Sequence, residues 1–281
     1  MNKSAHVIAL FALTVASLAN AQRARQQDPA TQQAALERQQ RFVGNVSPDA
    51  TTTCTYTFTS GTGNKFLKYC VTKNGNIVQF ESPSGQEYIA VGTIGEGYAF
   101  CDFDSETQYY DYAGYGDSGN WQAPTTASSS ASSVKINRET TDGIYTLTQN
   151  IAQNASSAFA QVTMTIKNNT SSSHHIGLLR YADVDASGDA DNSFDYTYRS
   201  AFGYNNMGYG LQLLYFSGEV SGGPSLNGGF AQIIAGGPNP CNIFDHVAGP
   251  LQNTDGSIFM QYDMELGAKK SATVVVDYKS F

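Results

Sequence analysis

Several segments of this chain alternate apolar and polar residues with a period of two. The clearest cases span residues 160–166, 258–266 and 272–278. Successive side chains of a β-strand point to opposite faces, so each segment has one face for a core and one for water. Strands of this kind are typical of antiparallel sheets that are solvated on one side. The alternation therefore predicts an antiparallel β protein.

Turn sequences separate these segments at short intervals. Asn74-Gly75, Asp142-Gly143 and Asp255-Gly256 are pairs that tight turns favour. From residue 50 on, Thr, Ser, Tyr, Val, Gly and Asn dominate, which is the composition of strands rather than helices. The pattern predicts roughly a dozen or more strands, and it favours a large two-sheet antiparallel sandwich over a small barrel. The Ser/Thr/Ala-rich segment 124–133 is predicted to be a mobile surface loop.

The first 45 residues do not follow the β pattern. Lys3, the apolar run at 7–18 and the small residues at 19–21 are typical of a secretory signal peptide, residues 1–21, cleaved after Ala21. Residues 22–45 are rich in Gln, Ala and Arg, and they predict a short polar leader that is disordered or loosely helical. We expect the remaining residues, 46–281, to form a single β-sandwich domain.

The expected location and the net charge of the protein exclude some classes of partner. The apolar run in the signal peptide is too short to cross a bilayer, and no later run approaches the required length. We therefore expect a secreted or periplasmic protein without a membrane span. The formal net charge is -8. An acidic surface argues against nucleic acids and anionic membranes as partners, because both repel it.

Four cysteines, Cys54, Cys70, Cys101 and Cys241, lie in the part of the chain that is exported. An oxidising compartment favours disulfides, and the sequence alone leaves three pairings open. We favour Cys54 with Cys70, because extended segments flank the turn-rich residues 60–64 between them. Cys101 would then pair with Cys241.

The order of elements in the second half resembles known proteins. Residues 161–213 give a strand, a polar turn, a strand that ends in the sequence RYADVD, and an Asp/Gly/Asn loop; two strands separated by Leu266-Gly267 follow. From about residue 54 to the end, the chain resembles a group of uncharacterised exported bacterial β-sandwich proteins. In strand pattern it is also similar to the β-supersandwich domains of carbohydrate-active enzymes such as mutarotases and certain glycoside hydrolases. This resemblance implies a fold; it transfers no catalytic residue, and no mutarotase His/Glu pair aligns here.

An acidic loop is the sharpest local motif. It contains Asp183, Asp185, Ser187, Gly188, Asp189 and Asp191. This spacing matches the first positions of a calcium loop, where alternate oxygens converge on a hard cation. The twelfth position is Phe194 rather than an acid, so the loop is not an EF-hand. We expect either a solvated polar loop or a looser calcium site with Asp183, Asp185, Asp189 and Asp191 as ligands; a catalytic carboxylate is a third alternative.

Aromatic and polar residues alternate around residues 109–121. Tyr110, Tyr112 and Trp121, together with Asp111, are suited to glycans, because aromatic rings stack on sugar rings while carboxylates accept hydrogen bonds from hydroxyl groups. Alternating tyrosines are equally typical of the buried face of a strand. Trp121 is the only tryptophan, and we expect it to be an exposed platform.

These motifs leave several functions open. Binding of a polysaccharide or another glycan is the leading hypothesis. An enzyme of the glycoside hydrolase kind would need two carboxylates facing each other across a cleft, drawn from Asp102, Asp104, Glu106 or Asp111 with Asp183 or Asp185. A structural or adhesive surface module is the third hypothesis.

Overall fold

The computed structural model describes residues 51–89, 95–154, 158–215 and 224–281. Almost all regular structure in these residues is β, which confirms the predicted fold class. The predicted signal peptide, 1–21, and leader, 22–45, lie outside the described residues. Two short 3-10 helices, η1 (Gly63–Lys65) and η2 (Ala186–Gly188), interrupt the strands.

The strands follow one another in short steps. They are β1 (Tyr56–Ser60), β2 (Leu67–Val71), β3 (Ile77–Glu81), β4 (Glu87–Ile89), β5 (Glu96–Asp102), β6 (Thr107–Ala113), β7 (Gly116–Asp117), β8 (Thr125–Ser129), β9 (Ser133–Glu139), β10 (Tyr145–Asn154), β11 (Phe159–Asn168), β12 (His174–Asp183), β13 (Asp191–Thr197), β14 (Ser200–Tyr204), β15 (Gly210–Tyr215), β16 (Ser225–Gln232), β17 (Leu251–Asp255), β18 (Ser257–Leu266) and β19 (Ser271–Ser280).

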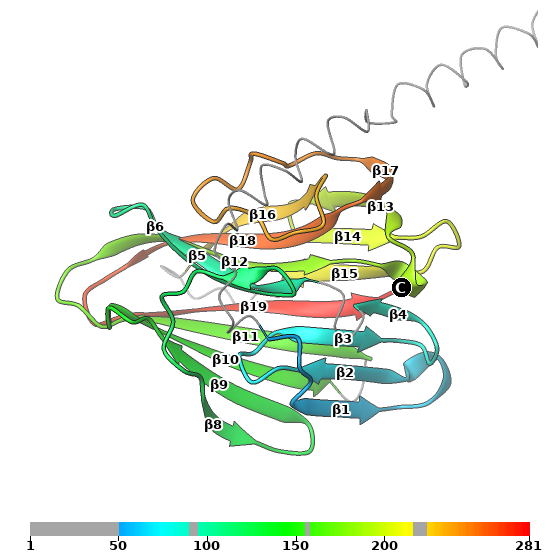
Figure 1. The fold of residues 1–281 in the computed structure, drawn as a ribbon, viewed down its shortest axis with the longest axis horizontal. Helices are drawn as coiled ribbons and strands as arrows, with labels where there is room; N and C mark the ends of the chain where they lie inside the picture. The colour runs from blue at the N-terminus through cyan, green and yellow to red at the C-terminus, as the bar shows by residue number, and fades with distance from the viewer. Residues whose placement is uncertain (1–50, 90–94, 155–157, 216–223) are drawn as a thin grey trace, which may run out of the picture.

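The strands form three antiparallel sheets in two layers (Figure 1). One layer is a nine-stranded sheet in the order β17-β13-β14-β15-β19-β11-β10-β9-β8. A six-stranded sheet, β16-β18-β12-β5-β6-β7, and a four-stranded sheet, β1-β2-β3-β4, lie against it. One hydrophobic core takes side chains from all three sheets. The sandwich therefore has one continuous layer and one divided layer.

The predicted alternating segments all lie in strands that have neighbours on both sides. Residues 160–166 belong to β11, 258–266 to β18 and 272–278 to β19. In β11 the apolar face is buried and the polar face is partly exposed, as the period of two requires. Segment 124–133 differs from its prediction as a loop. Five of its residues form β8, an exposed edge strand paired with β9.

Both disulfides match the expected pairing. Cys54 is bonded to Cys70 in β2, and Cys101 in β5 is bonded to Cys241. Cys241 belongs to residues 233–250, which connect β16 to β17 and which we call the 233–250 loop. The second bond therefore fastens this loop to the six-stranded sheet.

A buried arginine joins the three sheets. Arg180 in β12 is fully buried, and its guanidinium group lies 2.6 Å from Glu96 Oε1 in β5. It also donates to the Tyr278 hydroxyl in β19 at 2.9 Å and to the Gln149 side chain in β10 at 2.5 Å. A third bond, 3.0 Å long, runs to the carbonyl oxygen of Gly75 in the turn between β2 and β3. One side chain thus contacts both layers.

A second buried ion pair lies beside the first. Arg138 in β9 lies 2.8 Å from Asp111 Oδ2 in β6, and both side chains are at most 2% exposed. Asn74 in the β2–β3 turn donates to the same carboxylate oxygen at 2.8 Å. Burial raises the pKa of Asp111 to about 6 although Arg138 lowers it. The Arg138 charge therefore opposes the effect of burial on the pKa of Asp111.

The two ion pairs generate a stability prediction. Replacing Glu96 with glutamine keeps the side-chain shape but leaves the Arg180 charge buried without a counter-charge. Removing one partner of a buried ion pair typically costs about 3 to 5 kcal/mol, so we expect a loss of that size in the free energy of unfolding. Chemical denaturation measures it. Glu265→Gln, at an exposed position of β18, is the matched control and is expected to change stability by less than about 0.5 kcal/mol. Equal stability of the two variants would contradict the role of the pair.

Candidate functional site

The prediction that Trp121 forms an exposed platform is wrong. Its side chain is only 7% exposed and its indole N–H donates to the Tyr110 carbonyl oxygen at 3.0 Å. Arg138 lies over the indole ring, 5.2 Å from its centroid, and Tyr98 and Phe100 contact it edge to face. Trp121 pairs in an isolated bridge with Thr140, so it is held at the sheet rather than in an open loop. The ring belongs to the main core.

Tyr110, Tyr112 and Asp111 are also buried, for two different reasons. They alternate along β6, so Asp111 faces the layer interface and the two tyrosines face the other side. There the 233–250 loop covers them: the Tyr112 hydroxyl donates to the Pro238 carbonyl oxygen at 2.7 Å. The exposed fractions are 8% for Tyr110 and 0% for Tyr112 and Asp111. Like Trp121, these three residues therefore have a structural role in this conformation. The interpretation of the tyrosines as the buried face of a strand predicts this.

The acidic loop forms a different cluster from the expected one. Oxygens of Asp183, Asp185 and Asp255 all lie within 4.8 Å of one another, an arrangement that could hold a metal ion. Asp183 ends β12 and Asp185 precedes η2, whereas Asp255 ends β17. The expected ligands Asp189 and Asp191 do not belong to this group, and both are exposed. Asp255 could not be identified from the sequence, because nothing in the local pattern indicates that β17 ends beside β12.

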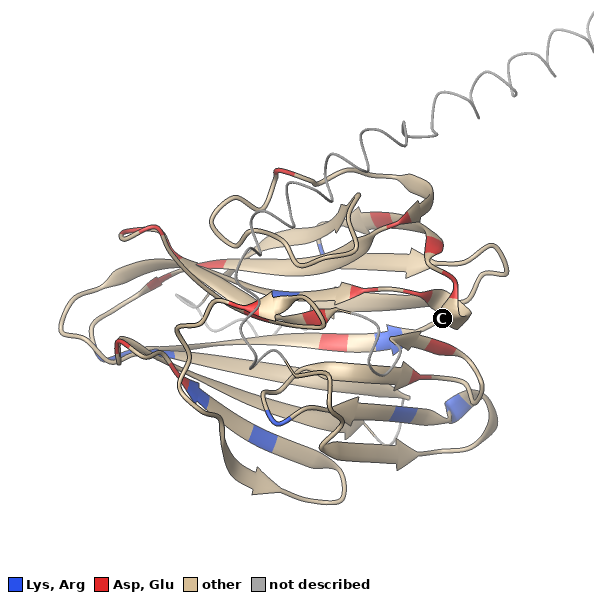
Figure 2. Ribbon diagram, in the orientation of Figure 1, with Lys and Arg blue, Asp and Glu red and all other residues tan. Residues whose placement is uncertain are grey.

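The surroundings of the cluster disfavour three ionised carboxylates. Burial raises the pKa of Asp183 well above its usual value, and the charges of Asp185 and Asp255 add to the rise. Burial also raises the pKa of Asp185 to about 7, with further contributions from Asp255 and Asp189. Figure 2 shows acidic segments where β13 and β17 lie. This corner of the sandwich therefore has an excess of negative charge.

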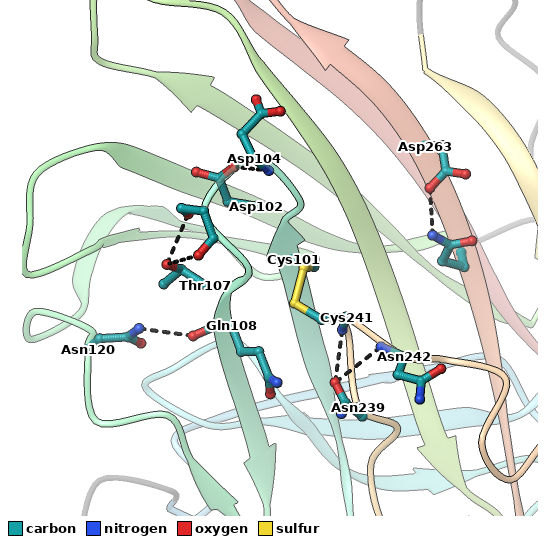
Figure 3. The surroundings of a disulfide bond; sticks show 12 residues. Cys101, Asp102, Asp104, Thr107, Gln108, Asn120, Asn239, Cys241, Asn242 and Asp263 are labelled. Carbon is teal, nitrogen blue, oxygen red and sulfur yellow. Dashed lines mark hydrogen bonds between the residues drawn. A yellow bond between two sulfur atoms is a disulfide. The ribbon is translucent and has the colours of Figure 1, made fainter.

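A second acidic group lies next to the Cys101–Cys241 disulfide (Figure 3). It consists of Asp102, Asp104 and His174. The buried carboxylate of Asp102 already accepts hydrogen bonds from the Tyr145 hydroxyl at 2.8 Å and from the Asp104 N–H at 3.1 Å. His174 Nδ1 lies 3.1 Å from it. These contacts satisfy Asp102 within the protein, so this group is explained by local structure.

Aromatic side chains do reach the surface on β14. Phe202 and Tyr204 are partly exposed, and Phe281, which is 50% exposed, lies beside them. The ring centroids are 6.2 Å apart for Phe202 and Tyr204 and also for Phe202 and Phe281. We call Phe202, Tyr204 and Phe281 the outer aromatic patch. It lies on the outer face of the nine-stranded sheet.

The inner face of β14 explains why these rings point outward. Ala201 and Gly203 face the core, where Phe194 fills the space; a Cβ at Gly203 would lie 2.6 Å from that ring. Small residues are therefore required inside, and the large residues occupy the outer positions. The signal in the sequence was the alternation of small and aromatic residues at 201–204, which reverses the usual pattern.

Polar side chains surround the outer aromatic patch. Phe202 is directly opposite Gln212 in β15 and Asp195 in β13. Gln212 in turn is opposite Lys279 in β19. Residues directly opposite each other share one face of a sheet. An amide, a carboxylate and an ammonium group therefore lie in one row with an aromatic ring.

Comparison with known proteins gives a fold but no family. No protein-family model matches the chain, and no curated protein matches it. A bacterial glucoamylase complexed with acarbose has a similar structure, with a TM-score of 0.58 at 8% sequence identity over 82% of this chain. The match covers 32% of the glucoamylase, so this chain spans about a third of that protein. The resemblance to sandwich domains of carbohydrate-active enzymes is thus confirmed at the level of the fold.

Two further structures are similar over most of their own length. A GalM/aldose epimerase homologue from C. elegans matches with a TM-score of 0.49 at 8% identity, over 80% of this chain and 98% of that one. A putative aldose 1-epimerase from Escherichia coli K12 matches with a TM-score of 0.42 at 12% identity, over 80% and 99%. The resemblance to uncharacterised exported bacterial proteins stays a prediction. Within the described residues, no helix is long and apolar enough to cross a membrane.

The burial of Trp121 can be tested by fluorescence, because it is the only tryptophan. We expect native emission to be blue-shifted and weakly quenched by acrylamide, since the indole is enclosed by aromatic rings and Arg138. The protein unfolded in guanidinium is the control, and it should be red-shifted and readily quenched. Strong quenching of the native protein would show that the indole is accessible and would restore its role as a platform.

Proposed function

We propose that this protein is an exported module that binds glycans, and that the outer aromatic patch is its binding surface. The observation that carries this proposal is the grouping of Phe202, Tyr204 and Phe281 on the outer face of a rigid sheet. Exposed apolar groups that lie together and are surrounded by polar residues commonly mark interaction sites. The outer aromatic patch therefore replaces the residues around Trp121 as the candidate surface.

The chemistry of the outer aromatic patch suits a sugar. Aromatic rings have a negative face, which attracts the weakly positive C–H groups on one side of a pyranose ring. Gln212 has both a donor and an acceptor, Asp195 an acceptor and Lys279 a donor, so the row can bond hydroxyl groups of either polarity. A site on strands also holds its groups in fixed relative positions. An extended polysaccharide, rather than a deeply enclosed small molecule, fits such an open face.

The fold is consistent with this proposal but does not choose between binding and catalysis. The glucoamylase was solved with acarbose, which is a property of that protein. For hydrolysis, two carboxylates must face each other across a cleft. Asp111 is unsuited to such a pair here, because it is fully buried and bonded to Arg138. A binding module is therefore the better-supported function, and an enzyme is the second candidate.

Substitution on β14 tests the proposal. The purified protein is first screened against a panel of polysaccharides by retention and thermal shift, and released reducing sugar is measured in parallel. One aromatic contact contributes about 0.5 to 1.5 kcal/mol, so Phe202→Ala and Tyr204→Ala are each expected to weaken binding roughly 2- to 12-fold. Unfolding of each variant is followed to confirm that the sheet is intact.

Phe244→Ala is the matched control. Phe244 is 59% exposed, but it lies in the 233–250 loop, and its ring contacts Phe230 of β16 rather than the outer aromatic patch, so its removal should leave affinity unchanged. Equal losses for Phe202→Ala and Phe244→Ala would exclude the outer aromatic patch as the site. Reducing sugar released by the parent protein would support the enzyme instead. Absence of retention on every polysaccharide would favour a structural or adhesive module.

A further inference from the structure

We propose that Asp183, Asp185 and Asp255 bind a calcium ion at the corner where the chain passes between the two larger sheets. This site is separate from the outer aromatic patch and does not depend on glycan binding. It differs from the linear calcium loop that the sequence suggests, because its third carboxylate comes from β17 rather than from residues 189–191.

One buried oxygen of the cluster has no hydrogen-bond partner. Asp183 is only 3% exposed, and its Oδ1 atom has no hydrogen-bond partner among the described residues. Its other oxygen accepts a hydrogen bond of 3.3 Å from the Tyr115 hydroxyl. An unsatisfied buried carboxylate oxygen is costly, and bound cations are one common way to satisfy it. Tyr115 would orient the carboxylate from outside, as hydrogen-bond partners of metal ligands do.

The charges around the cluster also favour binding of a cation. None of the ion pairs among the described residues involves Asp183, Asp185 or Asp255. Asp191 lies directly opposite Asp255 in the β13–β17 pair, and like charges in that position repel. A divalent ion between the three carboxylates would offset two of these negative charges.

The ligand atoms select the kind of ion. All three side chains are carboxylates, the ligands that hard cations prefer, and no cysteine or histidine belongs to the group. The ligand oxygens lie within 4.8 Å of one another, so one calcium ion at about 2.4 Å from each could contact all three carboxylates. Calcium also tolerates irregular geometry and takes water as additional ligands, whereas magnesium requires a nearly ideal octahedron.

The position of the site gives calcium a structural consequence. β12 belongs to the six-stranded sheet and is followed through η2 by β13 of the nine-stranded sheet. β17 of the nine-stranded sheet returns through Gly256 to β18 of the six-stranded sheet. Two crossings between the layers therefore meet at this corner. A calcium ion would hold both crossings together and so stabilise the folded state against separation of the layers.

Calorimetry and thermal unfolding of the chelator-treated protein test the site. We expect one calcium ion to bind per chain, with a dissociation constant on the order of 0.1 to 1 mM as in other extracellular modules. At about tenfold excess over that constant, calcium should raise the melting temperature by about 3 °C. Magnesium at the same concentration should give a smaller shift. A larger response to magnesium, or no heat and no shift with calcium, would overturn the proposal.

Two variants separate a metal site from a merely structural cluster. Asp185→Asn removes a ligand and a repulsive charge, so we expect it to weaken calcium binding at least about tenfold. Without calcium, the same variant should be as stable as the parent protein or more stable. Glu265→Gln removes an exposed acid elsewhere and should leave the calcium response intact. A full calcium response in Asp185→Asn would assign the ion to another place, and glycan retention should be unaffected by either change.

Discussion

The buried guanidinium group of Arg180 is the interaction on which the divided layer depends. It contacts Glu96, Tyr278, Gln149 and Gly75, and these partners come from all three sheets. A buried charge without partners would cost several kcal/mol, so these contacts must form together. Their geometry fixes where the β2–β3 turn lies between the layers, and hydrophobic contact alone is not directional enough to do so. The network thus explains why a four-stranded sheet and a six-stranded sheet can share one core.

The fold was predictable because its main signal is local. Alternation along 160–166, 258–266 and 272–278 requires only that each strand bury one face, and the structure places each segment in a strand with neighbours on both sides. The division into three sheets was not predictable, because it depends on contacts between Arg180 and residues far away in the chain. Segment 124–133 also shows that local composition can mislead. Its polar composition suggests a loop, but pairing with β9 makes part of it an edge strand.

The candidate sites were predicted less well, since they depend on which face of a strand is covered. Tyr110 and Tyr112 had the composition of a sugar-binding surface, but the 233–250 loop covers them and the Cys101–Cys241 bond fastens that loop. On β14 the reverse holds, because Phe194 leaves room only for small residues inside and so the aromatic residues face outward. Composition identifies the kinds of side chain, whereas tertiary packing decides which of them a ligand can reach.

The balance of charge distinguishes the structural acids from the candidate site. Glu96 and Asp111 are fully buried, but each has an arginine within 2.8 Å. Hydroxyl and amide groups also donate to them, although Asp111 Oδ1, like Asp183 Oδ1, has no hydrogen-bond partner among the described residues. Their burial is therefore accounted for by the fold. Asp183 is almost as deeply buried, but no ion pair among the described residues includes it, and the charged groups that act on its pKa, Asp185 and Asp255, are also acids. A bound cation would relieve the repulsion among these carboxylates. Glu96 and Asp111 have arginine partners within the protein, whereas Asp183, Asp185 and Asp255 do not. An ion from solution would therefore bind at the corner between the sheets rather than beside the buried arginines.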